Sequence, residues 1–314
     1  MKYTENAINV LTARTFKGIG RAWFANNWQK SFTNVDSIVK LLEHSCREGI
    51  ISVKKFEEKR EIVLEALAHS EHYIDGVIAI GDEYFPEYRG NVKASERPIF
   101  LFYKGDLSLL SKSNLNIAVI GLLTPTAEIE QREQKIVAEL VRENATIVSG
   151  LALGCDTIAH KQTLAMGGKT IAILPSPLSS ISPASNKELA YEIVEKGGLL
   201  ITEYLTAPKS RNDLIARYQE RDRLQALYSD CVVLSASYAP NDKGLDSGSR
   251  LAMGYAYNYD IPRAVIYDQS ECDNPMYDLN RQYIREDERV IVVNEQTMRK
   301  DVERILSRHK NTLF

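Results

Sequence analysis

Apolar and polar positions follow two different periods along the chain. Up to about residue 70, apolar side chains recur at three- and four-residue spacing, which predicts amphipathic helices. The predicted helices cover residues 7–15, 19–28, 35–43 and 53–68. From Tyr73 onward, short continuous apolar runs replace this pattern. The sequence therefore predicts a helical N-terminal domain over residues 1–70 and a second domain over residues 71–314.

The second region alternates strand-like runs with helix-like segments. The predicted strands are residues 77–81, 98–103, 117–120, 146–149, 170–174, 199–202, 231–235, 264–267 and 290–293. The predicted helices are residues 127–143, 157–166, 186–195, 214–227, 249–258 and 298–308. Continuously apolar strands alternating with helices are typical of a parallel sheet covered on both faces. The fold class predicted is α/β, a doubly wound, mainly parallel, extended Rossmann-like sheet with a small N-terminal helical domain.

Composition narrows the class of protein without naming a function. The chain has 314 residues, 44% hydrophobic and 26% charged, with a net charge of −3, as in an ordinary globular protein. No apolar run reaches the ~18 residues that span a bilayer, and the first 20 residues do not resemble a signal peptide. We therefore expect a cytoplasmic protein without membrane contact. The four cysteines are scattered, with no histidine at ligand spacing, so we expect free thiols, no metal and no cofactor.

The most informative stretch joins a predicted strand to a predicted helix between residues 147 and 160. Its turn contains Ser149, Gly150 and Gly154, and such a turn can bring backbone N–H groups close to a phosphate. Asp156 is expected to cap the helix. A tight connection without a ligand remains an equal alternative, because a lone glycine-rich turn is a weak signal. His160, which could act as a base or a metal ligand, is expected to have a packing role.

Other candidates for phosphate contact follow the same logic. Ser247, Gly248 and Ser249 precede a predicted helix and form a second possible anion site. Lys161 follows the first turn and either faces a phosphate-bearing ligand or is a solvated surface lysine. Arg221 and Arg223 lie two residues apart and point in different directions on a helix, so one can reach a ligand while the other pairs with a nearby acid. If these corners converge at the strand ends, they form one positive groove.

The ordered motifs resemble those of a known family. Residues 149–160 closely resemble the SGxAxGxDxxAH signature of the DNA-processing protein A (DprA, or Smf) family. The resemblance extends over roughly residues 75–268. Further segments that resemble the family's motifs, in order, are residues 81–86, 98–105, 116–121, 183–189, 202–204, 221–230 and 247–249. Such an ordered set is far more specific than any one motif.

This resemblance implies a fold and a function. It implies a helical N-terminal appendage with SAM-like hairpins, an extended Rossmann domain, and homodimers. It also implies that the protein binds and protects single-stranded DNA and helps to load a RecA-type recombinase during natural transformation, without being a catalyst. The DNA- or phosphate-binding residues expected on this basis, together with the turn arguments above, are Gly121, Ser149, Gly150, Gly154, Lys161, Asn186, Arg221, Arg223, Ser247, Gly248 and Ser249.

Two departures indicate a divergent member. The family's arginine two residues after the first glycine is replaced here, where the sequence reads Gly121-Leu122-Leu123. The segment that resembles FPxRNR contains Glu220 and Asp222, which add negative charge. Each lost phosphate contact removes part of the salt-dependent affinity for DNA. A C-terminal winged helix, which some members carry, is not evident in residues 269–314.

Two other functions remain as alternatives. A sensor of a small nucleotide-derived ligand fits the same fold, and the loss of the arginine after Gly121 fits a smaller ligand. A nucleotide phosphoribohydrolase ranks last, because residues 241–249 lack the PGGxGTxxE pattern and its glutamate. A dinucleotide-dependent dehydrogenase is disfavoured, because no GxGxxG follows the first parallel strand.

Overall fold

A computed structural model gives the architecture of residues 3–28, 30–47, 49–240 and 248–312, with side chains described up to residue 307. The described residues form a nine-stranded sheet in the order β1-β2-β6-β5-β4-β3-β7-β8-β9. The strands are β1 Gly76–Ala79, β2 Phe100–Gly105, β3 Asn116–Ile120, β4 Thr146–Ser149, β5 Thr170–Ile173, β6 Leu199–Thr202, β7 Cys231–Leu234, β8 Arg263–Ile266 and β9 Ile291–Val293. The nine predicted strands are confirmed.

Most of the sheet is parallel, and the chain reverses its winding at β3. From β3 the chain adds β4, β5 and β6 on one side, and then returns to add β7, β8 and β9 on the other. β2 pairs antiparallel with both β6 and β1, which completes one edge. In open sheets of this kind, ligands bind beyond the carboxyl ends of the strands, where the winding reverses. That point lies at the ends of β3 and β7.

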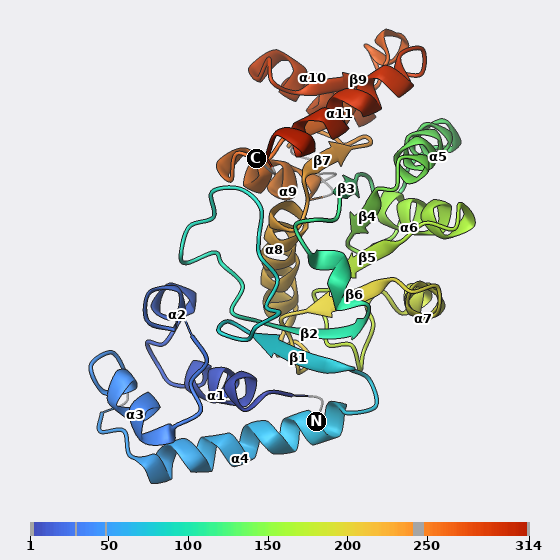
Figure 1. Ribbon diagram of the computed structural model, residues 1–314. Coiled ribbons are helices and arrows are strands. Elements are labelled where there is room, and N and C mark those ends of the chain that lie inside the picture. Colours follow the sequence, from blue (N-terminus) through green and yellow to red (C-terminus); the bar gives the residue numbers. More distant parts are fainter. Residues whose placement is uncertain (1–2, 29, 48, 241–247, 313–314) are drawn as a thin grey trace.

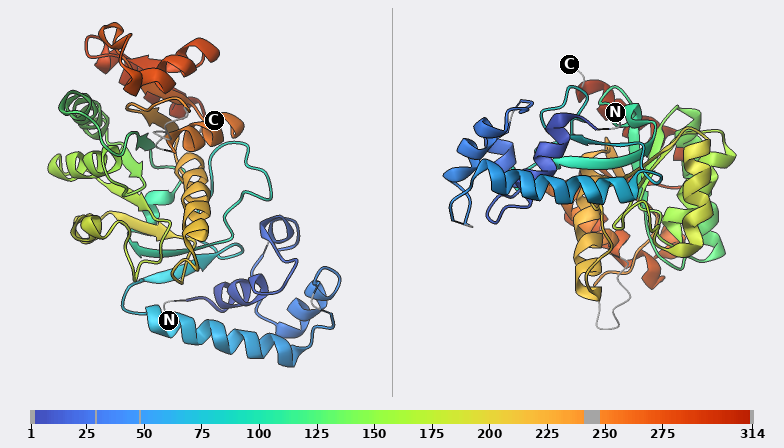
Figure 2. Two further views of the ribbon diagram at one scale, coloured as in Figure 1. Left: turned by 180° about the vertical axis from the view of Figure 1, so that it is seen from behind. Right: turned by 90° about the horizontal axis from the view of Figure 1, so that it is seen from below.

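Helices cover both faces of the sheet, as predicted for a doubly wound fold (Figures 1 and 2). One face packs against α5 Ala127–Arg142, α6 Cys155–Ala165, α7 Lys187–Glu195 and α11 Met298–Thr312. The other face packs against α8 Arg211–Leu227, α9 Ser249–Asn258 and α10 Asp278–Glu286. Alternate residues of each central strand enter the two cores: Ile147 contributes to one and Val148 to the other. This period of two explains why the strands read as continuously apolar.

The N-terminal helices lie beside the β1 edge in Figure 1, to its left and below it. They are α1 Glu5–Arg14, α2 Arg21–Asn27, α3 Val35–Glu43 and α4 Val53–Ser70. Side chains of Thr4, Asn34 and Ser52 cap α1, α3 and α4 by accepting backbone N–H groups. The hydrophobic cluster of these helices continues into β1, β2 and α7. A domain boundary after residue 70 therefore stays a prediction, since the structure shows one continuous cluster across it.

The joint between α1 and α2 is a packing corner. Phe16 and Ile19 on either side of the turn are buried, and so are Phe24 and Trp28 on and after α2. The Trp28 indole N–H donates to the Asn6 side chain, which satisfies its one polar group. The sequence of this joint is thus accounted for by packing.

Two predicted helix boundaries need correction, and one helix was not predicted. Helix α6 begins at Cys155 with Gly154 as its N-cap, so Asp156 lies inside the first turn and does not cap the helix. Helix α8 begins at Arg211, three residues earlier than predicted. Helix α10 was missed, because its nine residues carry few apolar side chains, chiefly Leu279 and Tyr283. Residues 269–312 accordingly hold one strand and two α-helices.

The described residues contain neither a membrane-spanning helix nor a cluster of metal-ligand side chains. Among them, no helix is both long and apolar enough to cross a bilayer. Within the same part of the chain, no three His, Cys, Asp or Glu side chains gather as metal ligands would. Cys46, Cys155, Cys231 and Cys272 are all free thiols.

Candidate nucleic-acid interface

The structure places a large groove where the winding of the sheet reverses. We call it the rim groove: a cavity of about 750 Å³ at the carboxyl ends of β3 and β4, between α8 and α9. Its described lining comprises Ile120, Gly121, Leu123, Ala152, Leu153, Asp156, Pro183, Arg211, Ile215, Tyr218, Gln219, Arg221, Asp222, Gln225, Gly248, Ser249, Leu251 and Ala252. Several of the predicted corners therefore meet at one place.

Close backbone packing explains the glycines at this place. A Cβ atom on Gly154 would lie 2.2 Å from the Leu122 carbonyl oxygen, and one on Gly121 would lie 2.6 Å from the Cys155 sulfur. Gly154 also has φ +71°, a conformation that side chains rarely adopt. The Cys155 N–H donates to the Leu122 carbonyl, and the Ser249 hydroxyl donates to the Gly121 carbonyl. The glycines thus bring β3, α6 and α9 together, and their first effect is structural.

Two amides of the turn after β4, including that of Gly150, already donate to an internal carboxylate. The Gly150 N–H donates to Asp156 Oδ2 at 3.0 Å, and the Ala152 N–H donates to the same oxygen at 3.2 Å. The Arg221 guanidinium lies directly over Gly150 and 3.6 Å from the Asp156 carboxylate. An internal carboxylate therefore occupies the position that an anion would take at this helix N-terminus.

Ser149 and Asn186 are also engaged inside the protein. Ser149 is fully buried, and its hydroxyl donates to the Val119 carbonyl on the neighbouring strand. The Asn186 amide donates to the carbonyl oxygens of Leu151 and Ala152 and to the Thr157 hydroxyl. Their side-chain donors already have internal acceptors, so their contact with DNA stays a prediction without support from these hydrogen bonds. Asn186 instead holds the β4–α6 turn in shape.

Arg223 points away from the rim groove and belongs to a different cluster. It is 1% exposed, and it pairs with Glu203 and, at 3.3 Å, with Glu220. Arg21 from α2 pairs with the same two carboxylates at 3.1 and 2.6 Å. These carboxylates raise the pKa of Arg223 despite its burial. Arg223 thus joins the N-terminal helices to α8 and does not line the rim groove, and its contact with DNA stays a prediction.

The remaining predicted residues fall in three places. Lys161 is exposed on α6 but does not line the rim groove. Gly248, with φ +79°, and Ser249 both line it at the start of α9. Ser247 lies outside the described residues. Of the two arginines, only Arg221 reaches the groove, as the two-residue spacing on a helix allows.

One face of α8 supplies lining residues that the sequence analysis missed. Arg211, Ile215, Tyr218, Asp222 and Gln225 follow one another at spacings of four, three, four and three residues. That spacing is the helical signal that could have identified them. Leu123 and Leu153 complete the wall from the two strand-end loops, and both are about half exposed. The groove thus combines apolar walls with two arginines and two aspartates.

Two donors in the groove have no acceptor among the described residues. Gln225 is 1% exposed, yet its Nε2 makes no hydrogen bond, and the Nε of Arg221 makes none either. Both side chains line the cavity. An unpaired buried donor is costly, and native proteins rarely leave one. These two donors are therefore the buried polar groups beside the groove that the described residues leave without a partner.

The ionisable groups beneath the groove are held neutral by burial. Desolvation raises the pKa of Glu133 to about 8 and lowers the pKa of His160 to about 3. It also raises the pKa of the Cys155 thiol well above its usual value. The His160 Nδ1 donates to the Thr170 hydroxyl, which itself donates to the Ile147 carbonyl. The packing role expected for His160 is confirmed by this arrangement.

Comparison with known proteins identifies the relatives of this chain. The family of the DNA recombination-mediator protein A matches residues 76–303. Protein Smf of Borreliella burgdorferi is 27% identical over 214 residues, covering 67% of this chain and 63% of the relative. The DNA processing protein DprA of Bacillus subtilis is 32% identical over 183 residues, covering 56% and 59%. The chain thus spans about three fifths of the length of these curated relatives.

Solved structures agree with this assignment. DNA processing protein A of Streptococcus pneumoniae has a TM-score of 0.70 at 24% identity, covering 97% of this chain and 98% of that one, and shows the shared fold. DNA processing protein A of Helicobacter pylori, whose structure concerns single-stranded DNA binding, has a TM-score of 0.55 at 25% identity and covers 72% and 99%. Since the family match spans well over half of the sequence, the chain belongs to the DNA recombination-mediator protein A family.

Proposed function

We propose that this chain binds single-stranded DNA in the rim groove, with Arg211 and Arg221 contacting phosphate or base acceptors. The observation that carries the proposal is the pair of unsatisfied buried donors, Arg221 Nε and Gln225 Nε2, beside a groove of about 750 Å³. Unstacked bases present acceptors on their edges and apolar faces that suit side chains such as Leu123 and Leu153. Family membership supports the same ligand.

The charges of the groove predict an unusual binding mode for such a protein. Arg221 is balanced by Asp156 and Asp222, at 3.6 and 3.5 Å. Arg211 is exposed at the start of α8 and has no ion pair with a described residue. Few phosphates are therefore neutralised, and we expect a shallow dependence of affinity on salt, with a slope of about −1 to −2 in log–log form.

The experiment is a fluorescence anisotropy titration of labelled oligo-dT and of a duplex at several salt concentrations. We expect the single strand to bind more tightly, and Arg211→Ala to lower the salt slope by about 0.7, the value of one single-strand phosphate contact. Lys54→Ala, an exposed cation on α4, is the matched control and leaves the slope unchanged. No binding of oligo-dT, or an equal loss in both variants, would refute the proposal.

A wider role follows if the single strand binds. Family membership supports a homodimer that protects incoming single-stranded DNA and assists a RecA-type recombinase in natural transformation, acting by binding and not by catalysis. The test is whether the purified chain accelerates assembly of a RecA-type filament on oligo-dT, and whether light scattering gives twice the mass of one chain. A single-chain mass, or no effect on assembly, would contradict this role.

One observation favours a second candidate, a small nucleotide-derived ligand. The cavity of about 750 Å³ lies within the usual range of small-molecule sites, and Leu123 stands where the family has a DNA-contacting arginine. A nucleotide that raises the melting temperature while oligo-dT does not would support this candidate against DNA.

A further inference from the structure

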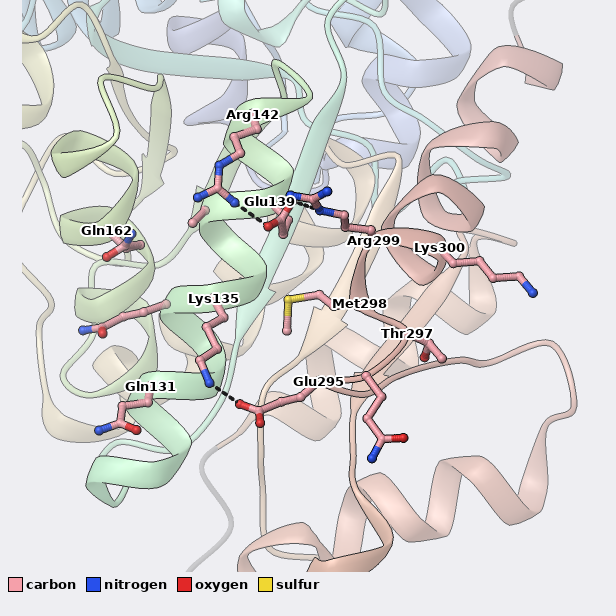
Figure 3. A pocket seen from close by; sticks show the side chains of 13 residues that line it. Gln131, Lys135, Glu139, Arg142, Gln162, Glu295, Thr297, Met298, Arg299 and Lys300 are labelled. Carbon is pink, nitrogen blue, oxygen red and sulfur yellow. Dashed lines mark hydrogen bonds and ion pairs between the residues drawn. The ribbon is translucent and has the colours of Figure 1, made fainter.

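A second large groove lies on the opposite face of the sheet from α8 and α9. We call it the α5–α11 groove; it has a volume of about 920 Å³ (Figure 3). One wall is a face of α5, with Gln162 of α6 beside it, and the other is the segment that leads from β9 into α11. Its lining comprises Gln131, Gln134, Lys135, Ala138, Glu139, Arg142, Gln162, Glu295, Gln296, Thr297, Met298, Arg299 and Lys300.

The groove is locally basic on a chain whose net charge is −3. Four cations and two carboxylates line it, which leaves a net charge of +2. Lys135 pairs with Glu295 at 2.5 Å, and Arg142 and Arg299 both pair with Glu139, so the arginines bracket one carboxylate. Figure 3 shows these three cations projecting across the groove from its two walls.

These ion pairs are weak enough to be exchanged for those of a partner. Arg299 is 84% exposed and lies 3.8 Å from Glu139, and the Lys135 and Arg142 side chains are more than half exposed. Exposed pairs of this kind contribute little to stability, because water and salt screen them. A carboxylate brought by a ligand can therefore replace Glu139 or Glu295 at small cost.

The uncharged lining favours a peptide over a nucleic acid. Four glutamine amides stand around a floor of Ala138 and Met298, and the described lining includes no aromatic side chain. Bases bound without pairing stack on aromatic side chains or on arginine planes, and here both guanidinium groups, Arg142 and Arg299, are already paired with Glu139. Glutamine amides both donate and accept, so they match the alternating N–H and C=O groups of an extended backbone.

We infer that the α5–α11 groove binds an extended acidic peptide segment of a partner protein. The stretch of α5 from Gln131 to Arg142 is about 16 Å long, which an extended chain of about five residues spans. Carboxylates on such a segment meet Lys135 at one end and the arginine pair at the other. Because this groove and the rim groove share no lining residue, both can be occupied at once.

The test uses the full chain and a fluorescein-labelled peptide of about ten residues in which Asp or Glu alternates with Ser or Leu. The same peptide with lysine at the acidic positions is the ligand control. We expect only the acidic peptide to bind, with an affinity that salt weakens. Arg142→Glu combined with Arg299→Glu lowers that affinity about tenfold or more. Both side chains are largely exposed, so the variant is expected to fold.

A matched variant, Lys54→Glu combined with Lys93→Glu, changes the net charge equally at exposed positions outside the groove and should bind the peptide normally. Oligo-dT binding should be the same in both variants. Three results would overturn the inference. They are failure of the acidic peptide to bind, equal losses in the two variants, and a selective loss of oligo-dT binding on reversal of Arg142 and Arg299. If the reversal of Arg142 and Arg299 changes the mass of the protein in solution, the groove is assigned to a second copy of this chain instead of a peptide.

Discussion

Glu133 offers a direct test of the electrostatics beneath the rim groove. Its side chain on α5 is fully buried, and neither carboxylate oxygen makes a hydrogen bond of normal geometry within the described part of the chain. Burial raises its pKa from 4.5 to about 8, while the neighbouring Cys155 and Ser235 side chains oppose that shift. Nearby Asp156 and Glu130 add to the increase in pKa. The carboxyl group is therefore protonated in the folded protein at neutral pH.

This raised pKa makes stability depend on pH in a defined direction. Between pH 4.5 and about 8, the folded chain holds a proton on Glu133 that the unfolded chain has released. Because the folded state then binds more protons, the free energy of unfolding falls as the pH rises. The full change is about 5 kcal/mol, and the part between about pH 5 and pH 7 is about 2.5 kcal/mol.

The variant Glu133→Gln keeps the shape of the side chain but cannot ionise. We expect its free energy of unfolding, relative to the natural chain, to improve by about 2.5 kcal/mol between about pH 5 and pH 7. The measurement is urea unfolding of both proteins across this range, with the difference read from the transition midpoints and their slopes. Glu143→Gln, the same change at the exposed end of α5, is the control and should show no such trend. A difference between Glu133→Gln and the natural chain that stays constant with pH would refute the argument.

Two further substitutions, His160→Asn and Gly150→Ala, test residues near Arg221, and Gly254→Ala serves as the control for the second. The pKa of His160 is lowered to about 3 by burial and by Arg221, so the free energy of unfolding that depends on neutral His160 is lost as the pH falls below 6.5. Urea unfolding of His160→Asn against the natural chain should show a difference of about 1.5 kcal/mol between pH 6.5 and about pH 5, and no difference in slope would contradict the shift. Gly150→Ala places a Cβ atom 1.6 Å from the Arg221 guanidinium, and should displace it and weaken oligo-dT binding. Gly254→Ala, where a Cβ meets nothing within 4 Å, should leave binding intact and raise the free energy of unfolding by up to about 1 kcal/mol.

The strands and most helices could be predicted because their signals are local. A run such as residues 146–149 is apolar on both faces, and only a strand between two helical layers buries both. Helix α10 lacked such a signal, since most of its side chains are polar. The order of strands in the sheet depends on long-range pairing that no short window contains, so the sequence did not predict it.

The candidate site was harder to predict, because the same residue types serve the interior and a ligand equally well. Gly150 and Asp156 lie six residues apart, and the sequence does not reveal that the carboxylate accepts the glycine N–H. Arg223 looks like a DNA contact until Arg21, about 200 residues earlier, is seen to share its two carboxylates. Only the tertiary structure brings these groups together. The lining face of α8 was also missed, although its helical spacing was present in the sequence and could have identified it.

Under the proposed function, the internal acids determine how the chain holds DNA. The rim groove is not a positive channel, because Asp156 and Asp222 balance Arg221 and the neighbouring Leu123 is apolar. Asp156 also takes up the backbone amides that would otherwise receive a phosphate. Affinity for a single strand must then come mainly from contacts to the bases, through the apolar walls and the unpaired donors of Arg221 and Gln225. A shallow salt slope combined with a strong effect of Gly150→Ala would separate this mode from binding dominated by phosphate contacts.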